Sequence, residues 1–189
     1  NVIRFLRLLT DPKGYNLGQR HISLSTCGLV DRIYDLAKED LGITLSISLH
    51  APDNETRNKT MPVNRRWPVE QLMQACRDYF RTTGRRISFE YALIKGVNDS
   101  PADAQKLAKL LDGMICHVNL IPVNPIKERD FSQPDTKAVR EFQNKLEKNG
   151  INVTIRRERG SDIDGACGQL RRRYGAVKKE KPDEDICED

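Results

Sequence analysis

The chain has 189 residues, of which 38% are hydrophobic and 31% are charged, and its formal net charge is +5. This length allows one domain with a sizeable core. No apolar run approaches the ~20 residues that span a bilayer, and no signal-peptide pattern opens the chain, so we expect a cytoplasmic protein without membrane attachment. Its 5 cysteines are widely spaced and odd in number, which argues against a secreted disulfide scaffold.

Helical and strand patterns alternate along the chain. Apolar residues recur at helical spacing in some stretches and alternate with polar residues in others. The predicted helices are 2–9, 28–40, 67–84, 100–113 and 134–150, and the predicted strands are 20–25, 43–50, 86–94, 115–124 and 151–156. Strands separated by helices indicate parallel βαβ units.

The two ends of the chain differ in character. The first residue is Asn1, and a helical pattern begins at once, so we expect the chain to be part of a longer protein. Residues 174–189 show no periodicity and are rich in charge. We therefore expect one domain over 1–173, followed by a disordered charged tail.

The predicted strands have one apolar and one polar face. In 43–50 the apolar side chains alternate with Thr44, Ser46, Ser48 and His50. A doubly wound sheet would be apolar on both faces, whereas a barrel with a ligand-filled lumen is polar on its inner face. Five strands are too few for a closed barrel of eight. The prediction is a partial (β/α) barrel of about five parallel strands with helices on the outer face.

In such a barrel, function lies at the carboxyl ends of the strands. Polar residues follow the predicted strands at these ends; they are Ser25, His50, Asn98, Asn124 and Arg156–Arg159. Glu90 lies on the inner face, where it either pairs with a base such as Arg156 or contacts a ligand. The clustered arginines either bind an RNA backbone or form surface ion pairs.

Five stretches make the pattern specific. They are "LSTCG", "SISLHAPDNETRNKTMPVNRRWP", "FEYALIKGVNDS", "HVNLIPVNP" and "RRERGSDIDGACGQL". In this order and spacing they resemble the RlmN family of dual-specificity RNA methyltransferases, which are radical S-adenosylmethionine (SAM) enzymes, over 1–173. The radical SAM type of partial barrel is the fold that this resemblance implies.

The resemblance implies a reaction and its site. The family methylates carbon 2 of an adenosine in 23S rRNA and in tRNA, through a methylated cysteine, and a second cysteine resolves the product by forming a disulfide bond. It uses SAM and a 4Fe-4S cluster that needs an electron donor. By the matching motifs, Cys167 is the methylated cysteine, and the cofactor contacts are Ser25, Ser48, Leu49, His50 and Asn124.

This sequence departs from the family pattern, because it lacks the glycine–glutamate motif that holds the methionine end of SAM, the resolving cysteine and the N-terminal accessory domain. The CxxxCxxC motif that holds the cluster is not in it, so no metal ligand is assigned and we expect this chain alone to be inactive. Two other functions stay open. One is the related Cfr-type methylation of carbon 8 of the same adenosine, and the other is a non-catalytic RNA-binding module.

Overall fold

The computed structural model describes residues 1–123 and 131–156. By its internal contacts the chain divides into two units, Asn1–Arg156 and Arg157–Asp189, and every described residue belongs to the first. Among these described residues, no helix has both the length and the apolar character needed to cross a membrane.

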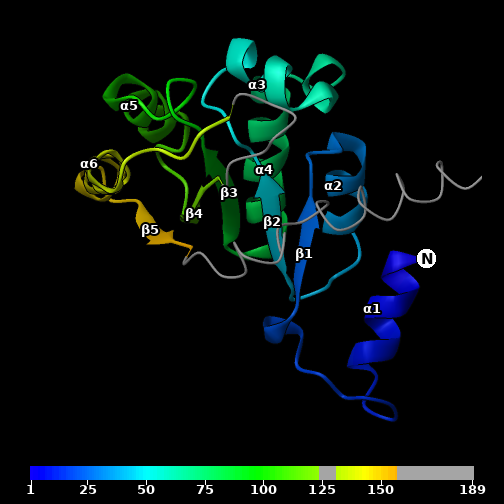
Figure 1. Cartoon of the computed structure of the whole chain (residues 1–189). Coiled ribbons are helices and arrows are strands. Elements are labelled where there is room, and N and C mark those ends of the chain that lie inside the picture. Colours follow the sequence, from blue (N-terminus) through cyan, green and yellow to red (C-terminus); the bar gives the residue numbers. More distant parts are fainter. Residues whose placement is uncertain (124–130, 157–189) are drawn as a thin grey trace, which may run out of the picture. The chain divides into compact units, whose positions relative to one another are not determined.

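The centre of this unit is one sheet of five parallel strands (Figure 1). The strands are β1 (Ser23–Thr26), β2 (Thr44–Ser48), β3 (Ile87–Leu93), β4 (Cys116–Pro122) and β5 (Asn152–Ile155). Their order in the sheet is β1-β2-β3-β4-β5, the same as their order in the chain. This arrangement confirms the predicted partial barrel.

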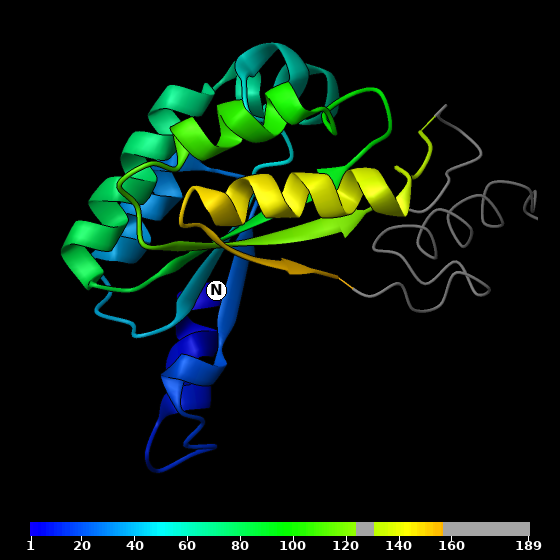
Figure 2. The same ribbon diagram turned by 90° about the vertical axis from the view of Figure 1, so that its left-hand side faces the viewer.

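Helices alternate with the strands and gather on one face of the sheet. They are α1 (Val2–Thr10), α2 (Val30–Ala37), α3 (Asn54–Thr60), α4 (Val69–Thr83), α5 (Pro101–Leu110) and α6 (Thr136–Lys148), with 3₁₀ turns η1 (Gln19–His21) and η2 (Pro62–Arg65). Figure 2 shows α4, α5 and α6 on the same side of the strands. Right-handed crossovers between successive neighbouring strands place every intervening helix on one face.

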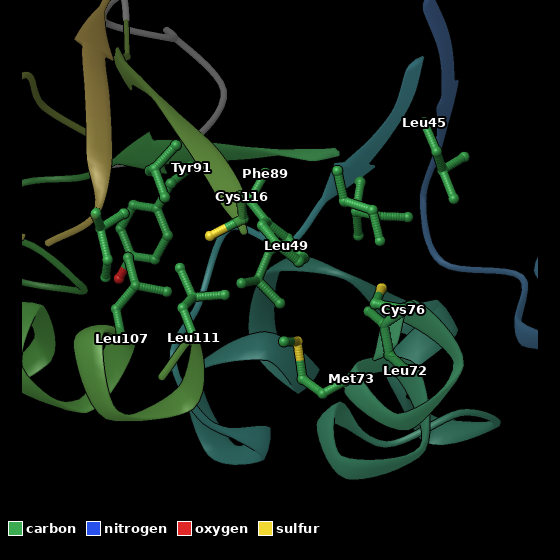
Figure 3. Close-up of a cluster of buried hydrophobic side chains, with 14 of the residues drawn as sticks. Leu45, Leu49, Leu72, Met73, Cys76, Phe89, Tyr91, Leu107, Leu111 and Cys116 are labelled. Atoms are coloured by element: carbon green, nitrogen blue, oxygen red, sulfur yellow. The ribbon is translucent and has the colours of Figure 1, made fainter. Parts of the chain in front are cut away.

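The core fills the space between this face and the helices. The burial of β3 alternates along the strand, with Phe89 and Tyr91 buried and Ser88, Glu90 and Ala92 half-buried. Figure 3 shows these aromatic rings among leucines of the helices, with Cys76 of α4 and Cys116 of β4 in the same cluster. Both cysteines thus pack as small apolar side chains in the core.

Helix ends follow local sequence signals. Helix α4 ends at Gly84, whose φ of 64° is the left-handed conformation that glycine adopts without strain. Helix α5 begins with a capping box: the Ser100 hydroxyl accepts a hydrogen bond from the Asp103 backbone N–H, and the Asp103 carboxylate accepts one from the Ser100 N–H. Ser100 is therefore the N-cap of α5.

Removing this cap should weaken the fold measurably. We expect Ser100→Ala to lower the free energy of unfolding by about 1 kcal/mol, because a helix-end N–H loses its acceptor. Urea denaturation of the 189-residue chain measures the change. The control is Gln105→Ala, an exposed position on the same helix, and an equal loss in both variants would contradict the role of the cap.

The structure differs from the sequence prediction in two places. The strand expected over 20–25 begins only at Ser23, because Gln19–His21 form a 3₁₀ turn. Helix α3 was not predicted, since its sequence NETRNKT has no apolar stripe. Its start is instead fixed by Asp53, whose carboxylate accepts a hydrogen bond of 2.9 Å from the Thr56 N–H.

Candidate functional site

The face of the sheet opposite the core carries polar side chains in two rows. The strand register places Ser25 beside Ser46, Ser46 beside Ser88, and Ser88 beside His117. Nearer the carboxyl ends, a second row runs from Ser48 through Glu90 and Asn119 to Thr154. The predicted polar inner face is therefore present.

Side chains of these rows form a directed chain of hydrogen bonds across β3, β4 and β5. The Thr154 hydroxyl donates to Asn119 Oδ1 at 3.2 Å, and Asn119 Nδ2 donates to Glu90 Oε2 at 2.8 Å. Because the Thr154 proton is used in this way, the contact of 3.0 Å between Thr154 Oγ1 and His117 Nε2 requires the ring nitrogen to donate. His117 Nδ1 then accepts from Ser88 Oγ at 3.1 Å.

This chain explains how a polar face is stabilised. His117 is held as a neutral ring, in agreement with a pKa lowered by burial first and by the charge of Arg86 second. The sequence left Glu90 open between a basic partner and a ligand, and the structure gives it Asn119 as a hydrogen-bond donor. Mutual partners thus satisfy these polar groups, which would otherwise be costly on a half-buried surface.

His50 lies directly after β2, at the carboxyl end of the sheet. Its φ of 59° lies in the left-handed region, which is uncommon for residues other than glycine. Its Nδ1 accepts a hydrogen bond of 3.0 Å from the Ala92 N–H, and its carbonyl accepts one of 2.8 Å from Asn98 Nδ2. Strained backbone of this kind is concentrated at functional sites, where surrounding contacts hold it.

The neutral imidazole ring of His50 carries one N–H proton, and its hydrogen bond shows which ring nitrogen carries it. Burial, and then the charge of Arg57, lowers the pKa of His50 from 6.5 to about 4, so the ring is neutral at pH 7. Since Nδ1 accepts, the proton is on Nε2. Within the described residues Nε2 has no partner, which leaves one N–H available for an acceptor on a ligand.

Comparison with known proteins gives relatives that share most of this sequence. No known protein-family model matches the chain. A probable dual-specificity RNA methyltransferase RlmN of Clostridium novyi is 58% identical over 174 residues, which are 92% of this chain and 51% of that protein. Proteins of the same name from Lachnospira eligens and Clostridium acetobutylicum are 58% and 55% identical over 174 residues.

The chain belongs to the RlmN family. It spans about half the length of the curated relatives that it matches. A crystal structure of a radical SAM methyltransferase from Sphaerobacter thermophilus superposes with a TM-score of 0.85 and 48% identity, covering 89% of this chain and 49% of that one. The fold of this RlmN-family chain is thus that of a radical SAM methyltransferase.

A more distant structure shares the fold alone. A domain of pyruvate-formate lyase-activating enzyme from Bacteroides vulgatus has a TM-score of 0.61 at 18% identity, covering 82% of this chain and 89% of that domain. At this identity the likeness carries the arrangement of strands and helices, and no shared substrate follows from it.

The structure places four of the six site residues that the RlmN-family motifs indicate. Ser25 is exposed on β1, where it lines a pocket of about 630 Å³ between α1, α2 and β1. Ser48 and His50 are half-buried at the end of β2. Leu49 is 0% exposed and its side chain lies in the core (Figure 3), so only its backbone is at this edge of the sheet. Cys167 and Asn124 lie outside the described residues.

The described cysteines do not resemble a cluster site. Cys27, Cys76 and Cys116 are free thiols, and burial raises the pKa of Cys76 to about 12 and that of Cys116 to about 11. Within residues 1–123 and 131–156 no three His, Cys, Asp or Glu side chains gather closely enough to hold a metal ion. A 4Fe-4S cluster needs thiolate ligands, and these residues do not fit it.

Sequence reasoning missed much of what holds His50. Asn98 was noted only as a strand-end residue, yet its side chain bonds to His50, Ala92 and Ile94. Arg57 was not singled out at all, although it is fully buried. The one usable signal is the combination of an arginine and an asparagine in α3 and η2, the two elements that follow β2 and His50 in the chain.

The neutral state of His50 predicts a pH dependence of stability. In the unfolded chain His50 takes up a proton near pH 6.5, and in the folded chain only near pH 4, so the unfolded state binds more protons between these values. We expect the free energy of unfolding to fall by up to about 3 kcal/mol as the pH drops from 6.5 to 4 and then to level off. His117, whose pKa is also lowered, contributes with the same sign.

Urea unfolding at pH 7.5 and 4.5 measures this dependence. His50→Asn should flatten it, because asparagine tolerates the left-handed backbone and does not titrate. His21→Gln, which replaces an exposed histidine, should leave the pH dependence as it is. An unchanged pH dependence in His50→Asn would contradict the assignment.

Proposed function

We propose that this chain is the C-terminal part of a radical SAM methyltransferase that methylates carbon 2 of an adenosine in 23S rRNA and in tRNA. Identity of 58% over 92% of the chain with proteins named dual-specificity RNA methyltransferase RlmN carries this proposal. In this proposal the complete enzyme consists of this sequence and an N-terminal part of about equal length, because the chain spans about half the length of its relatives. Its substrates are the two RNAs, its cofactors are SAM and a 4Fe-4S cluster, and it needs an electron donor.

The carboxyl end of the sheet offers the groups that a nucleoside cofactor needs. The His50 Nε2–H donates, and the hydroxyls of Ser25 and Ser48 donate and accept on the same face. We assign these three side chains, with the backbone of Leu49 and with Asn124, to SAM binding. SAM supplies an electrophilic methyl group and, with a reduced cluster, the radical that attack on an unactivated aromatic carbon requires.

Cys167 is the proposed acceptor of the methyl group. In the proposed step its Sγ, as a thiolate, would displace the methyl group of SAM: the S–CH₃ bond of the sulfonium would break, S-adenosylhomocysteine would leave with the electron pair, and a thioether would form on Cys167. The neighbouring arginines 156, 157 and 159 are proposed to bind RNA phosphates as the target adenosine is unstacked. We further propose a cytoplasmic location, a domain over 1–173 and a charged tail over 174–189.

The cluster belongs to residues outside this chain. We expect the 189-residue chain, after anaerobic reconstitution with iron and sulfide, to hold less than about one tenth of a cluster, because its cysteines lack the usual spacing. Iron and sulfide analysis measures this. The complete enzyme treated in parallel is the positive control, and a stoichiometric cluster on the chain alone would refute the expectation.

Mapping the methyl group tests the function itself. RNA from cells that lack the native gene and carry the complete enzyme is digested to nucleosides and analysed by mass spectrometry against authentic standards. We expect 2-methyladenosine in 23S rRNA and in tRNA. Methylation at carbon 8 would favour the Cfr-type alternative, and RNA binding without methylation would favour the non-catalytic module.

A further inference from the structure

Arg57 of α3 is a charged side chain at the centre of the fold, with 0% of its surface exposed. Among the described residues it forms no ion pair with a carboxylate. An isolated buried charge is costly unless several hydrogen bonds replace its water. The cost therefore indicates that the guanidinium has a specific task at this position.

Four hydrogen bonds replace the lost water, and three of them go to backbone carbonyls. Arg57 Nε donates to the Leu49 carbonyl at 3.0 Å, and Nη2 donates to the carbonyls of Cys27 at 2.7 Å and Ser48 at 3.2 Å. The fourth runs from Nη1 to Asn64 Oδ1 at 3.0 Å. The planar fork of arginine suits this set, because its donors diverge in fixed directions.

These carbonyls belong to the residues that form the edge of the proposed cofactor site. Cys27 follows β1, two positions after Ser25, and Ser48 and Leu49 lie at the end of β2, directly before the strained His50. A single rigid group thus joins the ends of two neighbouring strands at the place where Ser25, Ser48 and His50 lie. If the guanidinium moves, the relative positions of these side chains change.

The surroundings of Arg57 leave it little freedom. Asn64 holds Nη1 and is itself held, since its Nδ2 donates to Asn54 Oδ1 at 3.0 Å and to Asn58 Oδ1 at 2.9 Å. On the other side, Gly28 has a φ of 99°, and a Cβ there would lie 3.2 Å from Arg57 Nη2. The turn after β1 therefore packs directly onto the guanidinium.

We propose that Arg57 is a positioning residue for SAM: it fixes the Ser48–His50 segment against the end of β1 in the shape that binds the cofactor. Arg57 itself lies beneath the segment and bonds to its backbone, so it acts through Ser25, Ser48 and His50. This inference rests on the proposed function. It predicts that a variant without the Arg57 guanidinium binds SAM more weakly even when the variant folds.

The test is Arg57→Lys in the complete enzyme with its cluster reconstituted. Lysine keeps the charge but cannot reach Cys27, Leu49 and Asn64 together. We expect the Kd for SAM, measured by equilibrium dialysis, to rise by about tenfold or more. Asn64→Ala, which releases one arm of the fork and keeps the arginine, should raise the Kd by a smaller factor and serves if Arg57→Lys does not fold.

Two controls separate positioning from general stability. Arg77→Lys changes an arginine that also bonds to a backbone carbonyl, that of Leu110 at 3.1 Å, but in the helix layer. Leu146→Ala creates a cavity in the core beside α6 and lowers stability without touching the strand ends. Both should bind SAM with the affinity of the wild type.

The outcomes distinguish this inference from the proposed function. If the wild-type enzyme does not bind SAM, the proposed function fails. If the wild type binds SAM and Arg57→Lys and Asn64→Ala bind it equally well, the positioning role is overturned. A loss of affinity in Leu146→Ala as large as that in Arg57→Lys would likewise overturn it, because stability alone would then explain the effect.

Discussion

Replacing Cys167 by alanine is expected to lower the rate of RNA methylation by the complete enzyme by a factor on the order of 10³ or more. Alanine has no atom that can take up a methyl group, so the proposed thioether cannot form. The rate is measured under anaerobic conditions, with labelled SAM and an rRNA fragment that contains the target adenosine. Cluster content should stay at the wild-type level, since Cys167 is not a proposed ligand.

Cys187→Ala is the matched control. Cys187 lies in the charged tail, beyond the motifs that resemble the RlmN family, and its replacement should leave methylation unchanged. Methylation retained in Cys167→Ala would remove Cys167 from the proposed mechanism. Equal losses in the two variants would point to a general effect of cysteine removal.

Replacing Asn98 by alanine should produce the largest loss of stability at the site. The Asn98 side chain is 0% exposed, and its Nδ2 donates to the His50 carbonyl at 2.8 Å and to the Ala92 carbonyl at 2.7 Å. Its Oδ1 accepts from the Ile94 N–H at 2.8 Å. Alanine leaves the buried Ile94 N–H and the part-buried carbonyls of His50 and Ala92 without these partners, so we expect the free energy of unfolding to fall by about 3 kcal/mol.

Urea denaturation of the 189-residue chain at pH 7.5 measures this loss. Asn149→Ala is the matched control, because Asn149 also donates to a backbone carbonyl, that of Lys145 at 2.7 Å, but is exposed after α6. It should cost at most about 0.5 kcal/mol. A loss below about 1 kcal/mol in Asn98→Ala would mean that water or neighbouring groups replace the amide.

The sheet could be predicted from the sequence because, among the described residues, only one of its faces is covered by helices, so that apolar and polar residues alternate along each strand. In β3 the alternation of Phe89 and Tyr91 with Ser88 and Glu90 is visible in the letters, and the structure places the two sets on opposite faces. Helix α3 carries no such period, and its start depends on one hydrogen bond of Asp53. The alternation of buried and exposed residues can thus be predicted from this sequence, whereas a short helix whose start depends on one cap cannot.

The candidate site could be predicted only in part, because its architecture depends on contacts between distant residues. Ser48 and His50 follow from their strand, but Asn98 reaches His50 across 48 positions of sequence and Arg57 reaches Cys27 across 30. Nothing in the local sequence around Arg57 indicates that its side chain is buried. Its neighbours on both sides are polar, which is typical of an exposed helix.

The strictly consecutive order of the five strands also affects how the chain reaches its fold. Each of β2 to β5 pairs with the strand that precedes it in the chain, so a new ladder closes a loop of one helix, or of α3, η2 and α4 between β2 and β3. These loops are shorter than those of a sheet whose neighbouring strands lie far apart in the chain, so closing each of them costs less conformational entropy. Within this part of the protein, strands β1 to β5 can therefore pair in the order in which they are synthesised.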